Sequence, residues 1–122
     1  MQGQTDLQTG KKYDQEKVRM DLLSPIALEE IAKVMTYGAK KYGDHNWRGG
    51  LLWSRVFGAL MRHAWAYWQG ENKDPETGIS HLAHCGCCLM FLLEYTITHP
   101  ELDDRYGVKN ETNEKCGNNL PF

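Results

Sequence analysis

The sequence predicts an all-α protein, and three observations support this prediction. Apolar residues recur at helical spacing in two segments of the 122-residue chain, and a third long segment is apolar on almost every side. Residues that start and stop helices flank all three segments. The sequence also lacks internal repeats, low-complexity runs and the alternating pattern typical of half-buried strands.

The first predicted helix runs from Pro25 to about Lys41. Ser24 is expected to cap it, because a serine followed by proline is a frequent helix start. Lys40 and Lys41 complement the negative end of the helix dipole. Gly43 then provides a stop, since glycine readily adopts the left-handed conformation that ends many helices.

The second predicted helix carries its apolar residues between 56 and 68, with Ser54 as the expected cap and Gly70 as the stop. The third runs from about Ser80 to Thr98. Because the third helix is apolar almost all round, a single small chain would leave it partly uncovered. We therefore expect a helical bundle completed by oligomerisation, as a homodimer or homotetramer.

The composition suggests one small domain in residues 13–100, between a flexible N-terminus (1–12) and a polar C-terminal tail (101–122). A net charge of −2 gives no bulk attraction to a nucleic acid polymer or to an anionic membrane. No apolar run approaches the roughly 18 residues that a membrane-spanning helix needs. The first residues lack the apolar core of a signal peptide, so we expect a cytoplasmic protein with reduced cysteines.

Two pairs of residues suggest a site for a divalent metal ion. Glu71 and Asp74 are three residues apart, and His81 and His84 repeat that spacing at the start of the third helix. Residues three apart on a helix share a face, so each pair can direct two ligands at one point. Carboxylate oxygens and imidazole nitrogens are common ligands of divalent ions.

Each of these residues also has a structural interpretation. Asp74 precedes a proline and is typical of a turn, and a histidine on an apolar helix is often a satisfied core residue. A zinc site that uses Cys85 or Cys88 is conceivable, although paired C-x-x-C motifs are missing. His63, on the second helix among small neighbours, is equally well explained as a ligand or as a surface residue.

Basic and aromatic residues provide candidate contacts to a phosphorylated ligand. Charge-assisted hydrogen bonds to phosphate are strong, although any single basic residue is more often a solvated surface charge. An aromatic plane can stack on a base and an amide can bind its edge, but a tryptophan can equally pack on the core. The candidates are Lys17, Arg19, Lys40, Lys41, Asn46, Trp47 and Arg62.

Three sequence runs resemble the phage dATP/dGTP diphosphohydrolase family, which is similar to the MazG-like all-α nucleotide pyrophosphohydrolases. The resemblance covers about residues 12–97. Its runs are MDLLSPIALEEIAKVMTYGAKKYGDHNW, RHAWAYWQGENKDPETG and SHLAHCGCCLMFLLEY. No single run is specific, but their combination is.

The resemblance implies an oligomeric helical enzyme that hydrolyses a nucleoside triphosphate to the monophosphate and pyrophosphate with Mg²⁺ or Mn²⁺. The implied substrates are dATP and dGTP. In phages that place 2-aminoadenine in their DNA, this activity removes dATP and supplies dGMP. The implied location is the host cytoplasm.

The sequence departs from the superfamily pattern, in which E-x-x-E and E-x-x-D on successive helices bind the metal. The second helix instead presents His63 and the third presents His81 and His84, whereas carboxylates occur at Glu71 and Asp74. Either the imidazoles replace carboxylates, or the loop and first-helix carboxylates bind metal and the histidines support them. We expect a mixed site with Glu71 and Asp74 as its anionic and catalytic centre, and Glu29 as a further ligand.

Three other functions are compatible with the sequence. A non-catalytic metal-binding regulator would use the same imidazoles and nearby cysteines. A helical interaction module would oligomerise through its third helix without binding metal or nucleotide. An enzyme of the same fold could also act on dUTP, dCTP or a noncanonical nucleotide, because base selection depends on the shape of the pocket.

Overall fold

The computed structural model describes residues 10–13 and 15–108. Three helices form the body: α2 (Pro25–Tyr42), α3 (Trp53–Trp68) and α4 (His81–Thr98). Short 3₁₀ turns lie before α2, between α2 and α3, and after α4, at η1 (Met20–Leu22), η2 (Asn46–Gly49) and η3 (Pro100–Leu102). Within the described residues the only strand-like pairing is an isolated bridge, Lys73 with Ser80. The all-α prediction is confirmed.

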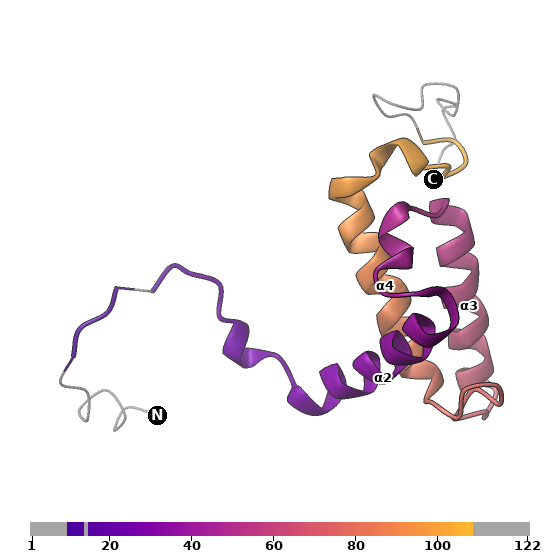
Figure 1. Ribbon diagram of the computed structural model, residues 1–122, viewed down its shortest axis with the longest axis horizontal. Coiled ribbons are helices and arrows are strands. Elements are labelled where there is room, and N and C mark those ends of the chain that lie inside the picture. Colours follow the sequence, from indigo (N-terminus) through magenta and orange to yellow (C-terminus); the bar gives the residue numbers. More distant parts are fainter. Residues whose placement is uncertain (1–9, 14, 109–122) are drawn as a thin grey trace.

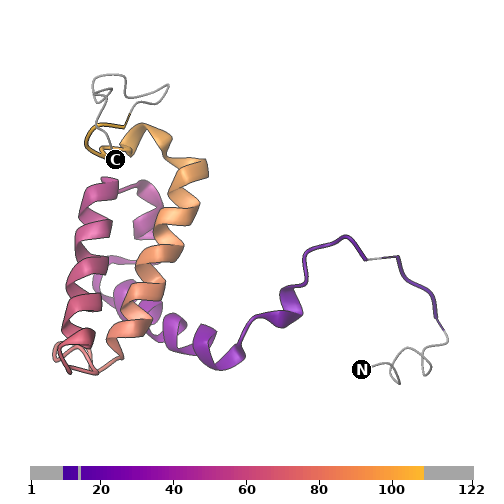
Figure 2. The same ribbon diagram turned by 180° about the vertical axis from the view of Figure 1, so that it is seen from behind.

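Helices α3 and α4 run side by side in opposite directions, and α2 crosses α4 near the N-terminal end of α4 (Figures 1 and 2). The chain before α2 leads away from this body. Residues 1–9 of the predicted N-terminal segment and residues 109–122 of the predicted tail lie outside the described residues. The loop that joins α3 to α4 lies at the end of the antiparallel pair, beside α2.

The boundaries of α2 follow the residues that predicted them. The Ser24 hydroxyl accepts a hydrogen bond from the Ala27 N–H at 3.1 Å, so it satisfies a backbone donor that the first turn leaves open. At the other end, Gly43 adopts φ +99°, and its N–H donates to the Ala39 carbonyl at 2.8 Å. A side chain at Gly43 would strain this backbone conformation, which explains the glycine.

The start of α3 differs from the prediction. Ser54 does not cap the helix, because the helix begins at Trp53 and Leu52 holds the capping position without a side-chain bond. The Ser54 N–H instead donates to Asp104 Oδ1 at 2.9 Å, and its hydroxyl donates to Oδ2 of the same carboxylate. A residue 50 positions away therefore supplies the negative charge that a helix N-terminus favours.

Helix α4 starts as predicted, with Ser80 accepting a hydrogen bond from the Leu82 N–H at 3.1 Å. A glycine in its second turn permits the close approach of α2. A Cβ atom at Gly86 would lie 2.7 Å from Cδ1 of Ile31. The missing side chain therefore sets the distance between the two helices.

The core lies where α3, α4 and η2 meet. Tyr95 is fully buried, and its hydroxyl donates to the Trp47 carbonyl. The Trp47 ring stacks on Phe91, with ring centroids 4.3 Å apart. A second cluster joins α2 to α4 through Val34, Ala83 and Cys87. The three cysteines of α4 are free thiols, as expected for reduced residues, and Cys116 lies outside the described residues.

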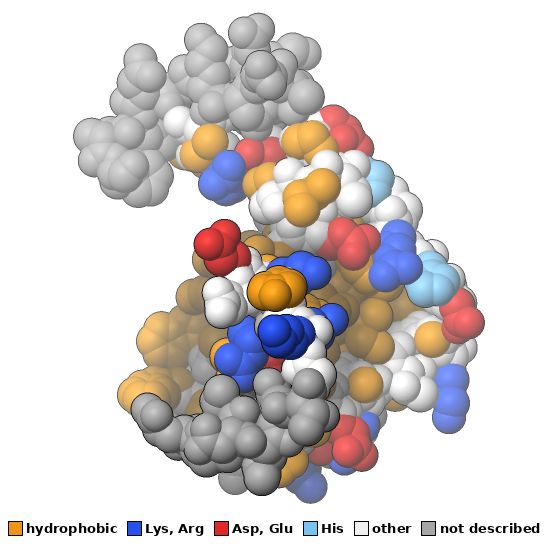
Figure 3. Space-filling model, turned by 90° about the vertical axis from the view of Figure 1, so that its left-hand side faces the viewer, with side chains coloured by type: hydrophobic (Ala, Val, Ile, Leu, Met, Phe, Trp, Pro, Cys, Tyr) orange, Lys and Arg blue, Asp and Glu red, His pale blue; other side chains and the backbone are white. Residues whose placement is uncertain are grey.

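Large apolar side chains are exposed on both α3 and α4. Figure 3 shows one side of the molecule, where hydrophobic side chains gather behind the N-terminal segment. None of the helices in the described part of the chain is long and apolar enough to cross a membrane. The exposed large apolar residues of these two helices are Phe57, Met61, Trp65, Trp68, Leu82, Leu89, Met90, Leu93 and Ile97.

Candidate metal centre

Three potential ligand atoms meet where the α3–α4 loop returns to the body. They are Nδ1 of His63 on α3, Oδ2 of Asp74 in the loop, and a ring nitrogen of His81 in the first turn of α4. All three lie within 4.8 Å of one another. The Nδ1 atoms of the two histidines are 2.9 Å apart, and Asp74 Oδ2 is 3.8 Å from His63 Nδ1.

The backbone of its own loop orients Asp74. Its Oδ1 atom accepts hydrogen bonds from the N–H groups of Glu76 at 2.7 Å and Thr77 at 3.1 Å. This is the turn role expected from the sequence, and it leaves Oδ2 directed at the histidines. Burial acts to raise the pKa of Asp74, but these N–H groups and the nearby imidazoles outweigh it and hold the pKa below 3.8. Asp74 is therefore anionic at neutral pH.

His84 lies beside the group rather than in it. Its ring stacks on His63, with centroids 4.3 Å apart and planes inclined by 8°. Its Nε2 atom is 2.8 Å from the Thr77 hydroxyl oxygen. Burial lowers the pKa of both His63 and His84 below 6.5; the His84 imidazole also lowers the pKa of His63, and the His81 imidazole that of His84. Both rings are thus held in the neutral form, which is the form of histidine that binds metal.

Glu71 contacts the other nitrogen of His81. Its Oε1 atom is 2.7 Å from His81 Nε2, whereas Nδ1 of the same ring faces His63. The structure therefore places Glu71 behind His81, outside the group of three potential ligands. His81 is buried, with 3% of its surface exposed, and the Glu71 side chain is half exposed.

The remaining ligand candidates are not brought into this group. Glu29 is exposed on α2 and is not among the grouped atoms of the described residues. The Cys85 thiol donates to the Leu60 carbonyl at a sulfur–oxygen distance of 3.6 Å. Cys88 packs against the aromatic core, and burial raises its pKa to about 11, so it stays a protonated thiol.

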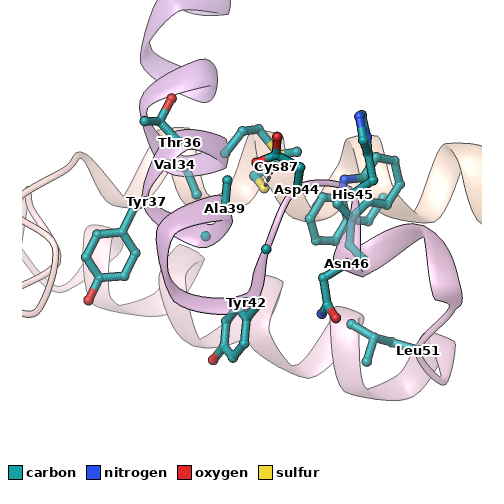
Figure 4. Close-up of a pocket in the computed structure, with 15 residues that line it drawn as sticks. Val34, Thr36, Tyr37, Ala39, Tyr42, Asp44, His45, Asn46, Leu51 and Cys87 are labelled. Atoms are coloured by element: carbon teal, nitrogen blue, oxygen red, sulfur yellow. Dashed lines mark hydrogen bonds between the residues drawn. The ribbon is translucent and has the colours of Figure 1, made fainter.

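A largely apolar cavity of about 680 Å³ lies between the C-terminal half of α2, η2 and α4 (Figure 4). Asn46 and Trp47 line it, as do Tyr37 and Tyr42 of α2. The Trp47 ring is mostly buried against Phe91, so the core-packing interpretation of this residue also applies.

The cavity and the metal candidates are linked through Glu76, which the sequence analysis did not single out. Its Oε2 atom accepts a hydrogen bond from the Tyr37 hydroxyl at 3.1 Å and lies 3.4 Å from Lys41 Nζ. Its backbone N–H binds Asp74. Lys41 is thereby the basic candidate that the structure connects to the site.

The other basic candidates lie apart from this connection. Lys17 and Arg19 are in the exposed segment that leads away from the body, where Arg19 pairs with Asp21 at 2.7 Å. Lys40 and Arg62 are exposed on α2 and α3. Thr77 was also missed by the sequence analysis, because a loop threonine gives no pattern that marks its contact with His84.

The donor set fits a divalent transition-metal ion. Two imidazole nitrogens and one carboxylate form the two-histidine, one-carboxylate set that such ions accept. The 2.9 Å between the nitrogens is close to the roughly 3 Å between neighbouring ligands on an octahedral ion with bonds of about 2.1 Å. Mg²⁺ fits less well, because it prefers oxygen ligands.

Comparison with known proteins identifies the family. A family profile described as the N-terminal domain of dATP/dGTP diphosphohydrolase matches residues 7–105, which include every residue of the site. The chain belongs to the dATP/dGTP diphosphohydrolase N-terminal family. This match confirms the family to which the three sequence runs pointed.

The chain is similar to a protein of Salmonella phage PMBT28 that is described as a dATP/dGTP diphosphohydrolase. The two are 39% identical over 97 residues, which make up 80% of this chain. The chain matches only 33% of that relative, so it spans about a third of the length. No solved structure matches the chain.

Proposed function

We propose that this chain is a metal-dependent nucleotide pyrophosphohydrolase that converts dATP and dGTP to dAMP and dGMP, releasing pyrophosphate. Family membership and the name of the phage relative support this substrate class. The observation that carries the proposal is the meeting of His63, Asp74 and His81 at one point. A metal bound there would neutralise phosphate charge and lower the pKa of a coordinated water.

In the proposed centre, Asp74 supplies the negative charge and the two imidazoles supply neutral ligands. Of the two ions implied by the family resemblance, Mn²⁺ suits this mixture better than Mg²⁺. The reaction adds water to the α-phosphorus and breaks its bond to the oxygen that leaves with pyrophosphate. Lys41, whose Nζ lies 3.4 Å from Glu76 Oε2, would stabilise the charge of that leaving group.

The cavity is the proposed site for the base and sugar. Its apolar lining suits a purine ring, and Asn46 offers an amide that can form hydrogen bonds at the base edge. Its Tyr37 end leads to Glu76 and hence to Asp74. A nucleotide lying along α2 would therefore have its phosphates nearest the metal candidates.

We also propose the biological role that the family resemblance implies. Hydrolysis of dATP would deplete the adenine precursor of DNA synthesis, and hydrolysis of dGTP would supply dGMP for making the 2-aminoadenine nucleotide. The phage source of the similar protein is compatible with this role in the cytoplasm of an infected cell.

Product analysis tests the proposed reaction. The protein would be incubated with each of the eight common NTPs and dNTPs, with Mn²⁺, Mg²⁺ or EDTA, and the products separated by anion-exchange chromatography. We expect dATP and dGTP to yield monophosphate and pyrophosphate with Mn²⁺, less product with Mg²⁺ and none with EDTA.

Other outcomes discriminate between the alternatives. Diphosphate with free phosphate would show cleavage of a different bond, and hydrolysis of dUTP or dCTP alone would change the substrate. Stoichiometric metal binding without any hydrolysis would favour the metal-binding regulator. Absence of both metal binding and hydrolysis would favour the interaction module.

We further propose that the chain works as a homodimer or homotetramer. The exposed face of α4 carries Leu82, Leu89, Leu93 and Ile97, and a stable monomer rarely exposes so continuous an apolar surface. A second copy would cover it in a symmetric contact. Light scattering after gel filtration should find an oligomer for the wild type and a monomer for Leu93→Glu. Arg55→Glu, which changes an exposed polar position on α3, is the matched control and should stay oligomeric.

A further inference from the structure

We propose that Glu71 is a positioning residue that fixes the tautomer of His81, so that His81 presents the lone pair of Nδ1 to the metal. The inference rests on the proposed metal centre, but not on the proposed substrate. It assigns Glu71 a different role from that of direct ligand, which the E-x-x-D spacing had indicated.

Glu71 and His81 are in direct contact. Glu71 Oε1 lies 2.7 Å from His81 Nε2, a distance typical of a charge-assisted hydrogen bond. An ionised carboxylate can only accept hydrogen bonds, so the hydrogen must be on Nε2. In a neutral imidazole the other nitrogen, Nδ1, then has no hydrogen and offers a lone pair.

The lone pair of His81 Nδ1 has a defined direction. His81 Nδ1 faces His63 Nδ1 at 2.9 Å, toward the three potential ligand atoms. Without metal, His63 would donate a hydrogen bond to His81 across this distance. A bound cation could be held by both Nδ1 lone pairs once the His63 ring has changed tautomer, losing the hydrogen on Nδ1 to solvent and taking one up on Nε2, so that it stays neutral.

Backbone hydrogen bonds hold Glu71 and His81 in this arrangement. The Glu71 N–H donates to the Ala66 carbonyl at the end of α3, and the His81 N–H donates to the Asn72 carbonyl, both at 3.0 Å. These two bonds clamp the base of the loop, so that Glu71 stays behind the His81 ring. His81 is almost fully buried, which leaves the ring little freedom to turn.

Long-range ¹H–¹⁵N correlation spectra of histidine rings in the metal-free protein at pH 8 test the tautomer directly. We expect His81 to carry its hydrogen on Nε2 in the wild type. In Glu71→Ala this preference should be lost, because the acceptor has gone. In Glu71→Gln it should persist, since the amide oxygen also accepts a hydrogen bond from Nε2.

Titration calorimetry with Mn²⁺ alone tests the consequence for the metal. Removing an outer partner of a metal-binding histidine typically lowers affinity about 10- to 100-fold, which is the loss expected for Glu71→Ala. Glu71→Gln should stay close to the wild type. A direct ligand would behave differently, because replacing a charged carboxylate by a neutral amide would weaken binding in both variants.

The chain offers a matched control. His99 and Glu101 form a second histidine–carboxylate contact, also 2.7 Å, at the far end of α4. The length of α4 separates it from His81 by about 27 Å. Glu101→Ala should leave the affinity for Mn²⁺ and the His81 tautomer unchanged.

A hydrogen on Nδ1 of His81 in the wild type, whether alone or together with one on Nε2, would overturn the inference. Equal loss of affinity in Glu71→Ala and Glu71→Gln would also overturn it and restore Glu71 as a ligand. Neither measurement involves nucleotide, so failure of the proposed hydrolysis would leave these results intact.

Discussion

Nδ1 of His63 lies 2.9 Å from Nδ1 of His81, and this pair joins the middle of α3 to the first turn of α4. Two imidazole nitrogens this close need either a hydrogen or another cation between them. Asp74 Oδ2, 3.8 Å from His63, provides the negative charge that favours the cation. The site therefore forms only when the two antiparallel helices are packed together.

The replacement Asp74→Ala should remove the anionic ligand while keeping the helices. We expect Mn²⁺ affinity and turnover of dATP and dGTP to fall by more than about 100-fold, because a direct ligand matters more than its outer partners. Calorimetry would measure the first and anion-exchange product analysis the second. Circular dichroism would verify that the helical content is unchanged.

Glu29→Gln is the control for this variant. Glu29 was predicted as a ligand from the sequence, but the structure keeps it exposed on α2 and outside the grouped atoms. Its variant should retain wild-type affinity and turnover. Near-normal activity of Asp74→Ala, or a large loss of affinity and turnover in Glu29→Gln, would show that the metal binds at a different place.

The helices could be predicted closely because their signals are local. Ser24 caps the helix that it was expected to cap, α4 begins next to the predicted Ser80, and Gly43 ends α2 with a positive φ, as expected of a glycine stop. Ser54 failed as a cap because its partner, Asp104, comes from a distant part of the chain. A contact between residues 50 positions apart has no local pattern.

The site could be predicted in composition but not in arrangement. Spacing placed Glu71 with Asp74 and His81 with His84, yet the structure groups one member of each pair with His63. The rule that residues three apart share a face holds within a helix, and Glu71 and Asp74 lie in a loop. The meeting of His63 and His81 depends on the packing of α3 against α4, which sequence spacing alone does not determine.

The two stacked imidazoles predict a pH dependence of stability. The pKa of His63 and of His84 is lower in the folded protein than the ordinary 6.5, chiefly because burial disfavours the charged ring. As pH falls below about 6.5, these two histidines take up protons more readily in the unfolded chain than in the folded protein. Their contribution to the free energy of unfolding is therefore fully present above that pH and is lost as pH falls toward their pKa values in the folded protein. Urea denaturation midpoints of the metal-free protein should decrease from pH 7 to pH 5.

The double variant His63→Gln/His84→Gln should flatten that decrease. His99 serves as a comparison with the opposite sign, because the Glu101 carboxylate raises its pKa and its contribution is lost as pH rises. His99→Gln should therefore keep the decrease toward acid pH. An unchanged slope in the double variant would show that these two imidazoles do not govern acid stability.

The crossing of α2 over α4 depends on Gly86. A Cβ atom there would lie 2.7 Å from Cδ1 and 2.9 Å from Cγ1 of Ile31, so Gly86→Ala must push the helices apart or displace the isoleucine. Overpacking of this kind typically costs about 1–3 kcal/mol in the free energy of unfolding. Urea denaturation would measure it. Adding Ile31→Ala should recover part of the loss, whereas additive losses would contradict the close approach.

Asp104 lies in the segment that follows α4 and caps α3. Replacing it should loosen both the start of α3 and that segment. In Asp104→Ala the Ser54 N–H and hydroxyl lose their acceptor, at a cost of about 0.5–2 kcal/mol, which is the range measured for helix caps. Ser24→Ala, which removes the local cap of α2, is a matched comparison of similar expected size. The two differ in hydrogen exchange: Asp104→Ala should raise exchange in the first turn of α3 and around η3, and Ser24→Ala only at the start of α2. If Asp104→Ala left exchange in α3 unchanged, the long-range cap would contribute nothing to holding residues 100–105 against α3.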